Sequence, residues 1–110
     1  MSVTADIAGV DIEAAAKRLH GHIRRTPILP LELGAFGSRA QLTLKLELLQ
    51  HSGSFKARGA FNSLLSMDVP KAGVVAASGG NHGAAVAFAA QSLGHVAEIF
   101  VPSLAAKAKI

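Results

Sequence analysis

The sequence predicts an α/β fold in which strands and helices alternate in the order βαβαβ and the strands are parallel. Three observations lead to this prediction. Short apolar segments recur along the chain. The later apolar segments are each followed by glycine and small polar residues and then by a segment with helical spacing. Half of the 110 residues are hydrophobic and only five are aromatic, a balance typical of helices packed closely on a sheet. We therefore expect a partial open parallel sheet without internal repeats or a linker.

The N-terminal half is predicted to contain one helix and one strand. Asp11 is expected to cap an amphipathic helix whose apolar residues continue at helical spacing to Ile23. Pro27 and Pro30 keep the following residues extended. Residues 42–47 alternate leucine with polar residues, which indicates a strand with one face in water, near an edge of the sheet.

The C-terminal half completes the alternation. Residues 55–65 have the spacing of a helix, and Val74 to Ala77 form a short apolar strand. The segment 82–93 is apolar on nearly all sides and stops at Gly94, as a buried helix would. Residues 96–101 are the third predicted strand.

A further helix is predicted to start at Leu104, and the sequence stops at Ile110 within its first turns. A three-stranded sheet needs additional elements to cover its edges. We therefore expect residues 1–110 to be the N-terminal segment of a truncated domain, with the rest of the fold and a second domain outside it.

Charge and composition exclude several classes of function. The net charge of +4 comes from scattered basic residues, the only adjacent pairs being Lys17 with Arg18 and Arg24 with Arg25, and no aromatic residues alternate with them. This pattern argues against nucleic-acid binding. There is no signal-peptide pattern, and polar residues interrupt the most apolar stretch, 83–102, which argues against a membrane span. The absence of cysteine excludes disulfides and is compatible with the cytoplasm.

Two strand-to-helix corners, residues 47–61 and residues 78–83, are the candidate functional segments. Ligands of open parallel sheets bind at the carboxyl ends of the strands, so we expect both corners to share one pocket. Lys56 falls in a first helical turn, where the helix dipole disfavours a charged amine. With Phe55 as an apolar wall, a neutral Lys56 amine could form a Schiff base with a carbonyl group. A solvated helix lysine is the alternative interpretation.

The second corner places small residues before a helix. Ser78, Gly79, Gly80 and Asn81 would let a carboxylate or phosphate reach backbone N–H groups at the helix start. An ordinary helix start capped by Asn81 is the alternative. His82 is the one histidine expected near the chemistry, with a structural role at the helix start as its alternative.

Other polar residues near the corners are predicted to be structural. Ser52 and Ser54 fit a turn and a helix N-cap, with contact to a cofactor as the alternative. Arg58 fits a helix-face charge or a structural ion pair, with binding of a ligand carboxylate as the alternative. The five histidines lack a metal-ligand spacing such as HExxH, so we expect no metal site.

Together, the strings LKLELLQHSGSFKARGAFN and SGGNHGAAVAFAA resemble the pyridoxal-phosphate enzymes of the type II, tryptophan-synthase-beta-like fold. The similarity is to the threonine dehydratase and serine racemase group, and it extends from about Thr26 to the C-terminus. It implies that Lys56 carries pyridoxal 5'-phosphate as a Schiff base and moves protons at the substrate α-carbon. It also implies that Phe55 packs at the cofactor ring, that Asn81 donates to its phenolic oxygen, and that the loop from Ser78 to His82 binds the substrate carboxylate.

The reaction implied by this resemblance is β-elimination and deamination of threonine or serine to a 2-oxo acid and ammonia. Racemases of the group have a serine where this chain has Gly79, so dehydration is favoured over racemisation. The glycine-rich phosphate loop and the partner of the pyridine nitrogen are expected beyond Ile110, so we expect the fragment to be inactive alone. The full-length protein is expected to be a cytoplasmic homo-oligomer.

Two alternatives stay open at this point. One is another enzyme of the same fold, either a serine racemase or a type II lyase with a different substrate. The other is a protein that keeps the two motifs without catalysis, as an amino-acid- or anion-binding module or an inert gene remnant.

Overall fold

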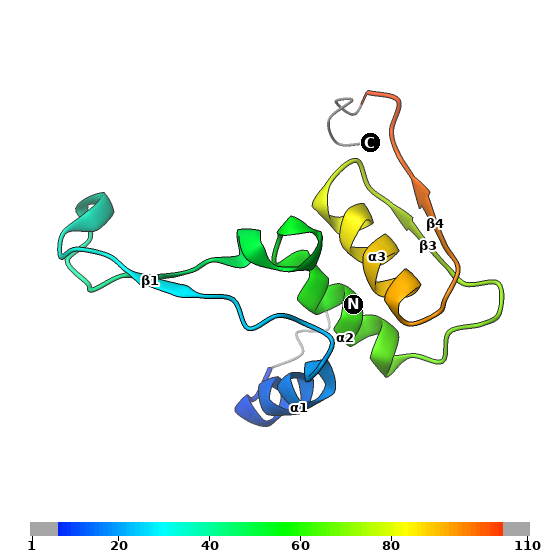
Figure 1. Cartoon of the computed structure of the whole chain (residues 1–110), viewed down its shortest axis with the longest axis horizontal. Helices are drawn as coiled ribbons and strands as arrows, with labels where there is room; N and C mark the ends of the chain where they lie inside the picture. Colours follow the sequence, from blue (N-terminus) through cyan, green and yellow to red (C-terminus); the bar gives the residue numbers. More distant parts are fainter. Residues whose placement is uncertain (1–6, 105–110) are drawn as a thin grey trace, which may run out of the picture.

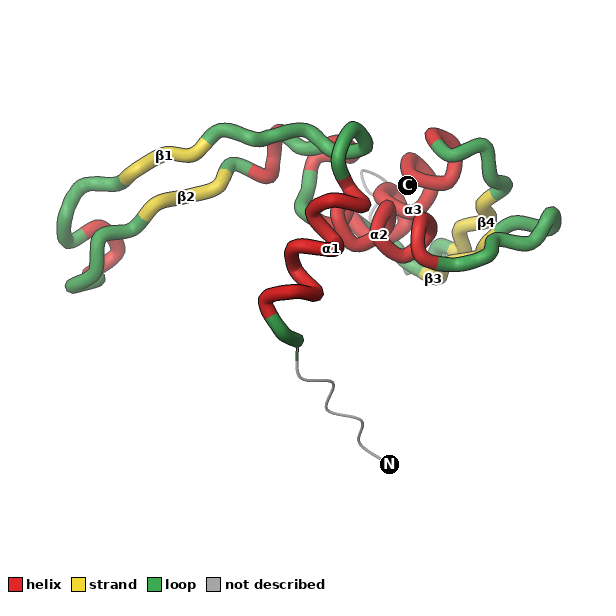
Figure 2. The backbone as a smooth tube through the Cα atoms, turned by 90° about the horizontal axis from the view of Figure 1, so that it is seen from below, coloured by secondary structure: helices red, strands yellow, loops and turns green. Residues whose placement is uncertain are grey.

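The computed structural model describes residues 7–104, which form a helical body with a small parallel sheet and a long two-stranded arm (Figures 1 and 2). The helix predicted from Leu104 onward lies almost entirely outside the described residues. The helices are α1 (Gly9–Leu19), α2 (Lys56–Ser66) and α3 (Asn81–Ser92), and the strands are β1 (Ile28–Pro30), β2 (Thr43–Lys45), β3 (Val74–Ala77) and β4 (Ala97–Phe100).

The β3, α3 and β4 elements form the predicted parallel unit. β3 pairs with β4 in register from Val74 opposite Ala97 to Ala77 opposite Phe100. The two strands begin at a close approach, because Val74 N–H donates to the carbonyl of Val96 at 2.9 Å. The preceding Gly73 has φ +90°, and a Cβ there would lie 2.1 Å from the Val96 oxygen, so this position requires glycine. The α/β class and its parallel sheet are confirmed.

The strand predicted at residues 42–47 does not join that sheet. Its central part, β2, pairs with β1 in a separate antiparallel ribbon, with Leu29 opposite Leu44. The ribbon continues beyond the ladder, since Leu46 N–H donates to the carbonyl of Pro27 at 2.9 Å. The prediction of one parallel βαβαβ sheet is therefore wrong at its first strand. A two-residue period shows which side chains share a face, but it does not identify the partner strand.

The arm formed by this ribbon projects away from the helices (Figure 2). Every residue of β1 and β2 is exposed, and Phe36, near the tip, is 86% exposed. Among residues 7–104, the arm is therefore held by its own ladder and by its base next to α2.

The first helix begins earlier than predicted. α1 starts at Gly9, so Asp11 lies in the first turn and is not the N-cap. The Asp11 carboxylate instead accepts a hydrogen bond from Ala8 N–H at 2.9 Å, which still satisfies a free donor at the helix start. The helix ends at Leu19 rather than at the predicted Ile23.

The core lies between α2 and α3. Phe61 is its largest fully buried side chain. The rings of Phe61 and Phe88 pack edge to face, with their centroids 6.1 Å apart. Small residues let the two helices pack closely, which fixes the first turn of α2 relative to the first turn of α3. The buried core consists of Leu19, Ala60, Phe61, Leu64, Ala85, Ala89 and Ala90.

Candidate active site

A cavity of about 600 Å³ lies between α2, β3 and the first turn of α3. Lys56 and Phe55 reach it from the first corner, and His82 reaches it from the second. Most other lining residues are small or apolar, such as Gly59 and Val75. The structure thus brings a residue of each corner to one cavity, as the sequence predicts.

The predicted loop residues are not all in this cavity. Ser78 and Gly80 line a separate cavity of about 190 Å³, together with Gly83 and Ile99. Gly79 is half-buried in the same turn, and Asn81 is exposed. Within residues 7–104, His82 is therefore the member of the loop that faces the Lys56 side.

Lys56 is the first residue of α2, and its backbone is held firmly. Its N–H donates to Ser54 Oγ at 3.3 Å. The N-cap residue of α2 is nevertheless Phe55, so the prediction that Ser54 caps this helix is wrong. The next residue, Ala57, is completely buried. The Lys56 side chain is exposed, with Nζ 5.3 Å from the centroid of the Phe55 ring. A neutral amine in a water-poor pocket stays a prediction, because residues 7–104 leave Lys56 open to solvent.

The start of α3 offers hydrogen-bond donors. Gly80 is the N-cap residue, so the alternative in which Asn81 caps the helix is wrong. Gly80 N–H donates to Ser78 Oγ at 3.2 Å, and the first intrahelical bond runs from Ala84 N–H to the Gly80 carbonyl. Within residues 7–104, the N–H groups of Asn81 and His82 have no backbone acceptor. The helix start can therefore accept an anion at these N–H groups.

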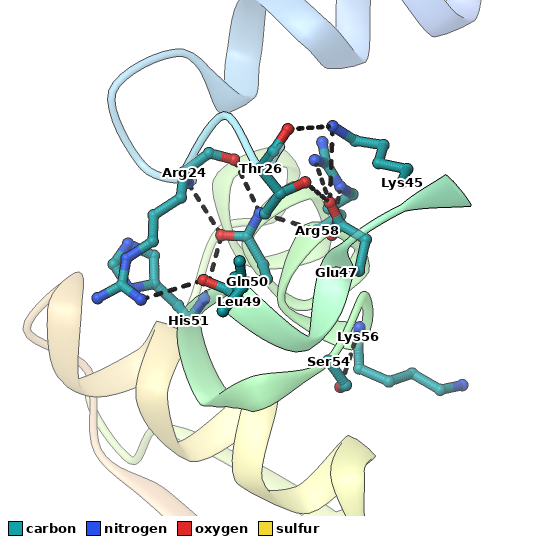
Figure 3. Close-up of polar contacts among 10 residues, drawn as sticks. All are labelled: Arg24, Thr26, Lys45, Glu47, Leu49, Gln50, His51, Ser54, Lys56 and Arg58. Atoms are coloured by element: carbon teal, nitrogen blue, oxygen red, sulfur yellow. Dashed lines mark hydrogen bonds and ion pairs between the residues drawn. The ribbon is translucent and has the colours of Figure 1, made fainter. Parts of the chain in front are cut away.

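A polar cluster supports the first corner (Figure 3). Its arginine, Arg58, does not line the Lys56 cavity. Arg58 donates from Nε and from its terminal nitrogen to the two carboxylate oxygens of Glu47, both at 2.8 Å. Thr26 Oγ1 donates to the same carboxylate at 2.5 Å. These hydrogen bonds, led by those from Arg58, lower the pKa of Glu47 to about 2. Arg58 is thus an ion-pair residue, which settles the alternatives left by the sequence.

Gln50, at the end of the short 3₁₀ turn Glu47–Leu49, completes the cluster. It is 2% exposed, and its side-chain amide accepts from Arg24 N–H and donates to the Arg24 carbonyl, both at 2.9 Å. This pairing attaches the segment before the arm to the first corner. Ser52, in the next turn, has φ +61°, and its hydroxyl is buried without a partner among the described residues.

The family model for pyridoxal-phosphate dependent enzymes matches residues 19–110. The chain belongs to this family. Within it, the chain is 45% identical over 102 residues to an L-threo-3-hydroxyaspartate ammonia-lyase from a Pseudomonas species, covering 91% of the chain and 32% of that protein. It is also 45% identical over 109 residues to the serine racemase of Arabidopsis thaliana, covering 96% of the chain and 32% of that protein.

Solved structures of pyridoxal-phosphate enzymes share the fold. Maize serine racemase superposes with a TM-score of 0.76 at 39% identity, covering 89% of the chain and 30% of that structure. The serine racemase of Dictyostelium discoideum gives a TM-score of 0.75 at 36% identity, covering 91% and 34%. A solved threonine deaminase gives a TM-score of 0.74 at 43% identity, covering 87% and 31%. The predicted type II fold is therefore confirmed for this part of the protein. The chain spans about a third of the length of the curated relatives it matches.

The residues on this cavity fit the family's cofactor, pyridoxal 5'-phosphate. Lys56 supplies a primary amine, the one group in a protein side chain that condenses readily with an aldehyde. The cavity of about 600 Å³ has room and apolar surface for an aromatic ring. The donors at the start of α3 suit an anionic oxygen.

Two further properties bear on the class of protein. No helix among residues 7–104 has the length and apolar character needed to cross a membrane. The same residues contain no group of three or more histidine, aspartate or glutamate side chains placed to hold a metal ion.

The cluster around Glu47 and Gln50 was not predicted. Both residues belong to the motif that carries the resemblance, but their partners, Thr26 and Arg24, lie more than 20 residues earlier. The one local signal in the sequence is that Glu47 and Gln50 interrupt a leucine-rich segment. In the structure, Glu47 is half-buried and Gln50 is buried. Such residues need partners, although the sequence does not say which.

Proposed function

We propose that this chain is the lysine-bearing part of a pyridoxal-phosphate-dependent ammonia-lyase that converts threonine or serine to a 2-oxo acid and ammonia. The observation that supports the proposal is the shared cavity, which has the Lys56 amine on one side and His82 and the start of α3 on the other. Relatives named as ammonia-lyases favour this reaction over others of the family.

Each residue of the two corners has a proposed role. Lys56 would hold the cofactor through its amine, and the free amine would take the proton from the substrate α-carbon. Phe55 would pack against the cofactor ring, and Asn81 would donate a hydrogen bond to its phenolic oxygen. When bound, pyridoxal phosphate supplies an electron sink next to the α-carbon. Loss of the α-proton and the β-hydroxyl, followed by hydrolysis, gives the 2-oxo acid and ammonia.

The loop from Ser78 to His82 is proposed to bind the substrate carboxylate. The N–H groups of Asn81 and His82 point out of the helix start, where they favour a negative charge. Gly79 has no side chain to deliver a proton from the opposite face of the α-carbon, so elimination is favoured over racemisation. Serine racemisation is the second candidate, because racemases are among the relatives of similar identity.

The rest of the site is proposed to come from chain outside these 110 residues, since relatives are about three times as long. A phosphate-binding loop and a partner for the pyridine nitrogen would lie there, and they would also cover Lys56 from solvent. The 110-residue chain is therefore expected to show negligible turnover alone. A cytoplasmic location and a homo-oligomeric assembly of the whole protein stay predictions.

The test uses the whole protein in which this sequence occurs, with Lys56→Ala and, as a control, Lys71→Ala at an exposed position away from the cavity. We expect a yellow protein whose borohydride-reduced cofactor is found at Lys56 by mass spectrometry, and 2-oxobutyrate formation from threonine. Lys56→Ala should abolish both, while Lys71→Ala should keep both.

Three results would contradict the proposal. Cofactor trapped in Lys56→Ala to the same extent as in the unaltered protein would remove Lys56 from its role. D-Serine formation from L-serine that exceeds 2-oxo acid formation would favour the racemase, and amino-acid binding without any turnover would favour a binding module.

A further inference from the structure

The pair formed by Arg58 and Glu47 lies next to Lys56 but outside its cavity. Arg58 is two residues after Lys56, in the same first turn of α2. It lines a different cavity of about 350 Å³, together with Lys45 and Arg25, whereas Lys56 lines the larger one. Figure 3 shows the Lys56 side chain extending away from the polar cluster. Arg58 therefore cannot act on a ligand of Lys56 by contact.

The geometry of the pair restrains the helix start strongly. The two hydrogen bonds of 2.8 Å are parallel and side-on, an arrangement that fixes the plane of the guanidinium as well as its distance. The Glu47 side chain is 15% exposed and that of Arg58 is 32% exposed, so water competes only partly for these bonds. A charge pair of this kind holds both position and orientation.

Glu47 is itself held from two other segments. Thr26, which is 5% exposed, donates to one of its oxygens, and Lys45 Nζ lies 3.8 Å from the same oxygen. Gln50 holds the neighbouring backbone at Arg24. The first turn of α2 is thus connected through one carboxylate to the chain on both sides of the arm.

We propose that Arg58 is a positioning residue which, through its pair with Glu47, sets the direction in which Lys56 enters the cavity. The proposal rests on the proposed role of Lys56. Lys56 and Arg58 share one helical turn, so a rotation of that turn would move both side chains together. Ser54 and the buried Ala57 hold the backbone near Lys56, and the Arg58 pair supplies the remaining restraint against rotation.

The decisive variant is Arg58→Lys, which keeps the positive charge but loses the planar fork. Arg18→Lys is a matched control, because Arg18 also donates a side-chain hydrogen bond to α2, at 2.6 Å to Asn62, but far from the first turn. The readout is the rate at which Lys56 forms an imine with added pyridoxal phosphate in the whole protein. This rate is measured by borohydride trapping and mass spectrometry, relative to trapping at Lys71 in the same molecules.

We expect Arg58→Lys to slow trapping at Lys56 about tenfold, with the Lys71 rate and the pH dependence of trapping unchanged because the charge remains. Arg18→Lys should leave both rates unchanged. If Arg58 only stabilised the fold, Arg58→Lys would lower the melting temperature. The ratio of the trapping rate at Lys56 to that at Lys71 would then stay unchanged at temperatures well below thermal unfolding. Glu47→Asp, which withdraws the carboxylate by one methylene, serves as the second variant if Arg58→Lys does not fold.

The outcomes separate this inference from the proposed function. Trapping at Lys56 that is as fast in folded Arg58→Lys as in the unaltered protein would overturn the positioning role alone. An absence of trapping at Lys56 in the unaltered protein would overturn both proposals.

Discussion

The imidazole of His51 stacks on the ring of Phe88, with their centroids 4.7 Å apart and an angle of 19° between the planes. His51 belongs to the 3₁₀ turn His51–Gly53, just before α2, and Phe88 is on α3. The stack therefore connects the Lys56 corner to the helix that carries His82. Desolvation, with a smaller contribution from the positive charge of Arg24, lowers the pKa of His51 from its ordinary value of 6.5.

This lowered pKa predicts a loss of stability in mild acid. The unfolded chain binds a proton at His51 more readily than the folded chain, so stability is fully present above about pH 6.5 and falls as the pH drops below it. His51→Phe, which keeps an aromatic ring but cannot titrate, should flatten the decrease in melting temperature between about pH 7 and pH 5. His20→Gln, at an exposed position, is the control. An unchanged slope in His51→Phe would contradict this account.

Glu47 predicts a second decrease at lower pH. Its folded pKa of about 2 lies below the ordinary value of 4.5, so its ionised form stabilises the fold above about pH 4.5 and this contribution disappears toward pH 2. Glu47→Gln should cost about 2 kcal/mol in free energy of unfolding at pH 7 and progressively less in acid.

Urea denaturation at several pH values would measure this difference, with Glu13→Gln on the exposed side of α1 as the control. A cost of Glu47→Gln that stays constant from pH 7 to pH 3 would show that the charge of Glu47 is not responsible.

Gly73 and Gly94 allow a matched test of backbone constraints. Both have positive φ, +90° at Gly73 and +77° at Gly94. A Cβ added at Gly73 would collide with the carbonyl of Val96, whereas a Cβ added at Gly94 would have no atom within 4 Å. Gly94→Ala should cost about 1 kcal/mol from the left-handed conformation alone. Gly73→Ala should cost more than about 3 kcal/mol, because the start of the β3 and β4 ladder must move. Equal costs in denaturant unfolding would mean that the approach to Val96 is not limiting.

The parts of the fold that the sequence predicts well are those set by local chemistry. Val74 to Ala77 is a strand with the predicted bounds, and α2 and α3 begin within one residue of their predicted starts. Short apolar runs, small residues and glycine decide these elements with little help from distant residues. The partner of residues 42–47 depends on which segments meet in space, so it was predicted wrongly. The N-cap of α1 was also predicted wrongly, because the helix begins at Gly9 and Asp11 accepts from Ala8 N–H within the first turn.

The candidate site shows the same division. Lys56 and His82 reach a common cavity because each motif places its residue at the start of a helix. The packing of α2 on α3 then brings the two helix starts to the same cavity. The residues that hold the first corner in place, Glu47 and Gln50, were missed because their function depends on Thr26 and Arg24. Pairing between distant polar groups leaves no periodic pattern in a sequence.

The exposed arm has a consequence for hydrogen exchange. An isolated ribbon of two strands is only marginally stable in water, and neither face of β1 or β2 packs on the body. Its ladder amides, such as those of Leu31 and Leu46, should therefore exchange with solvent deuterium long before those of the α2 and α3 core. Protection of the arm amides in the whole protein would then show whether another segment packs on the arm.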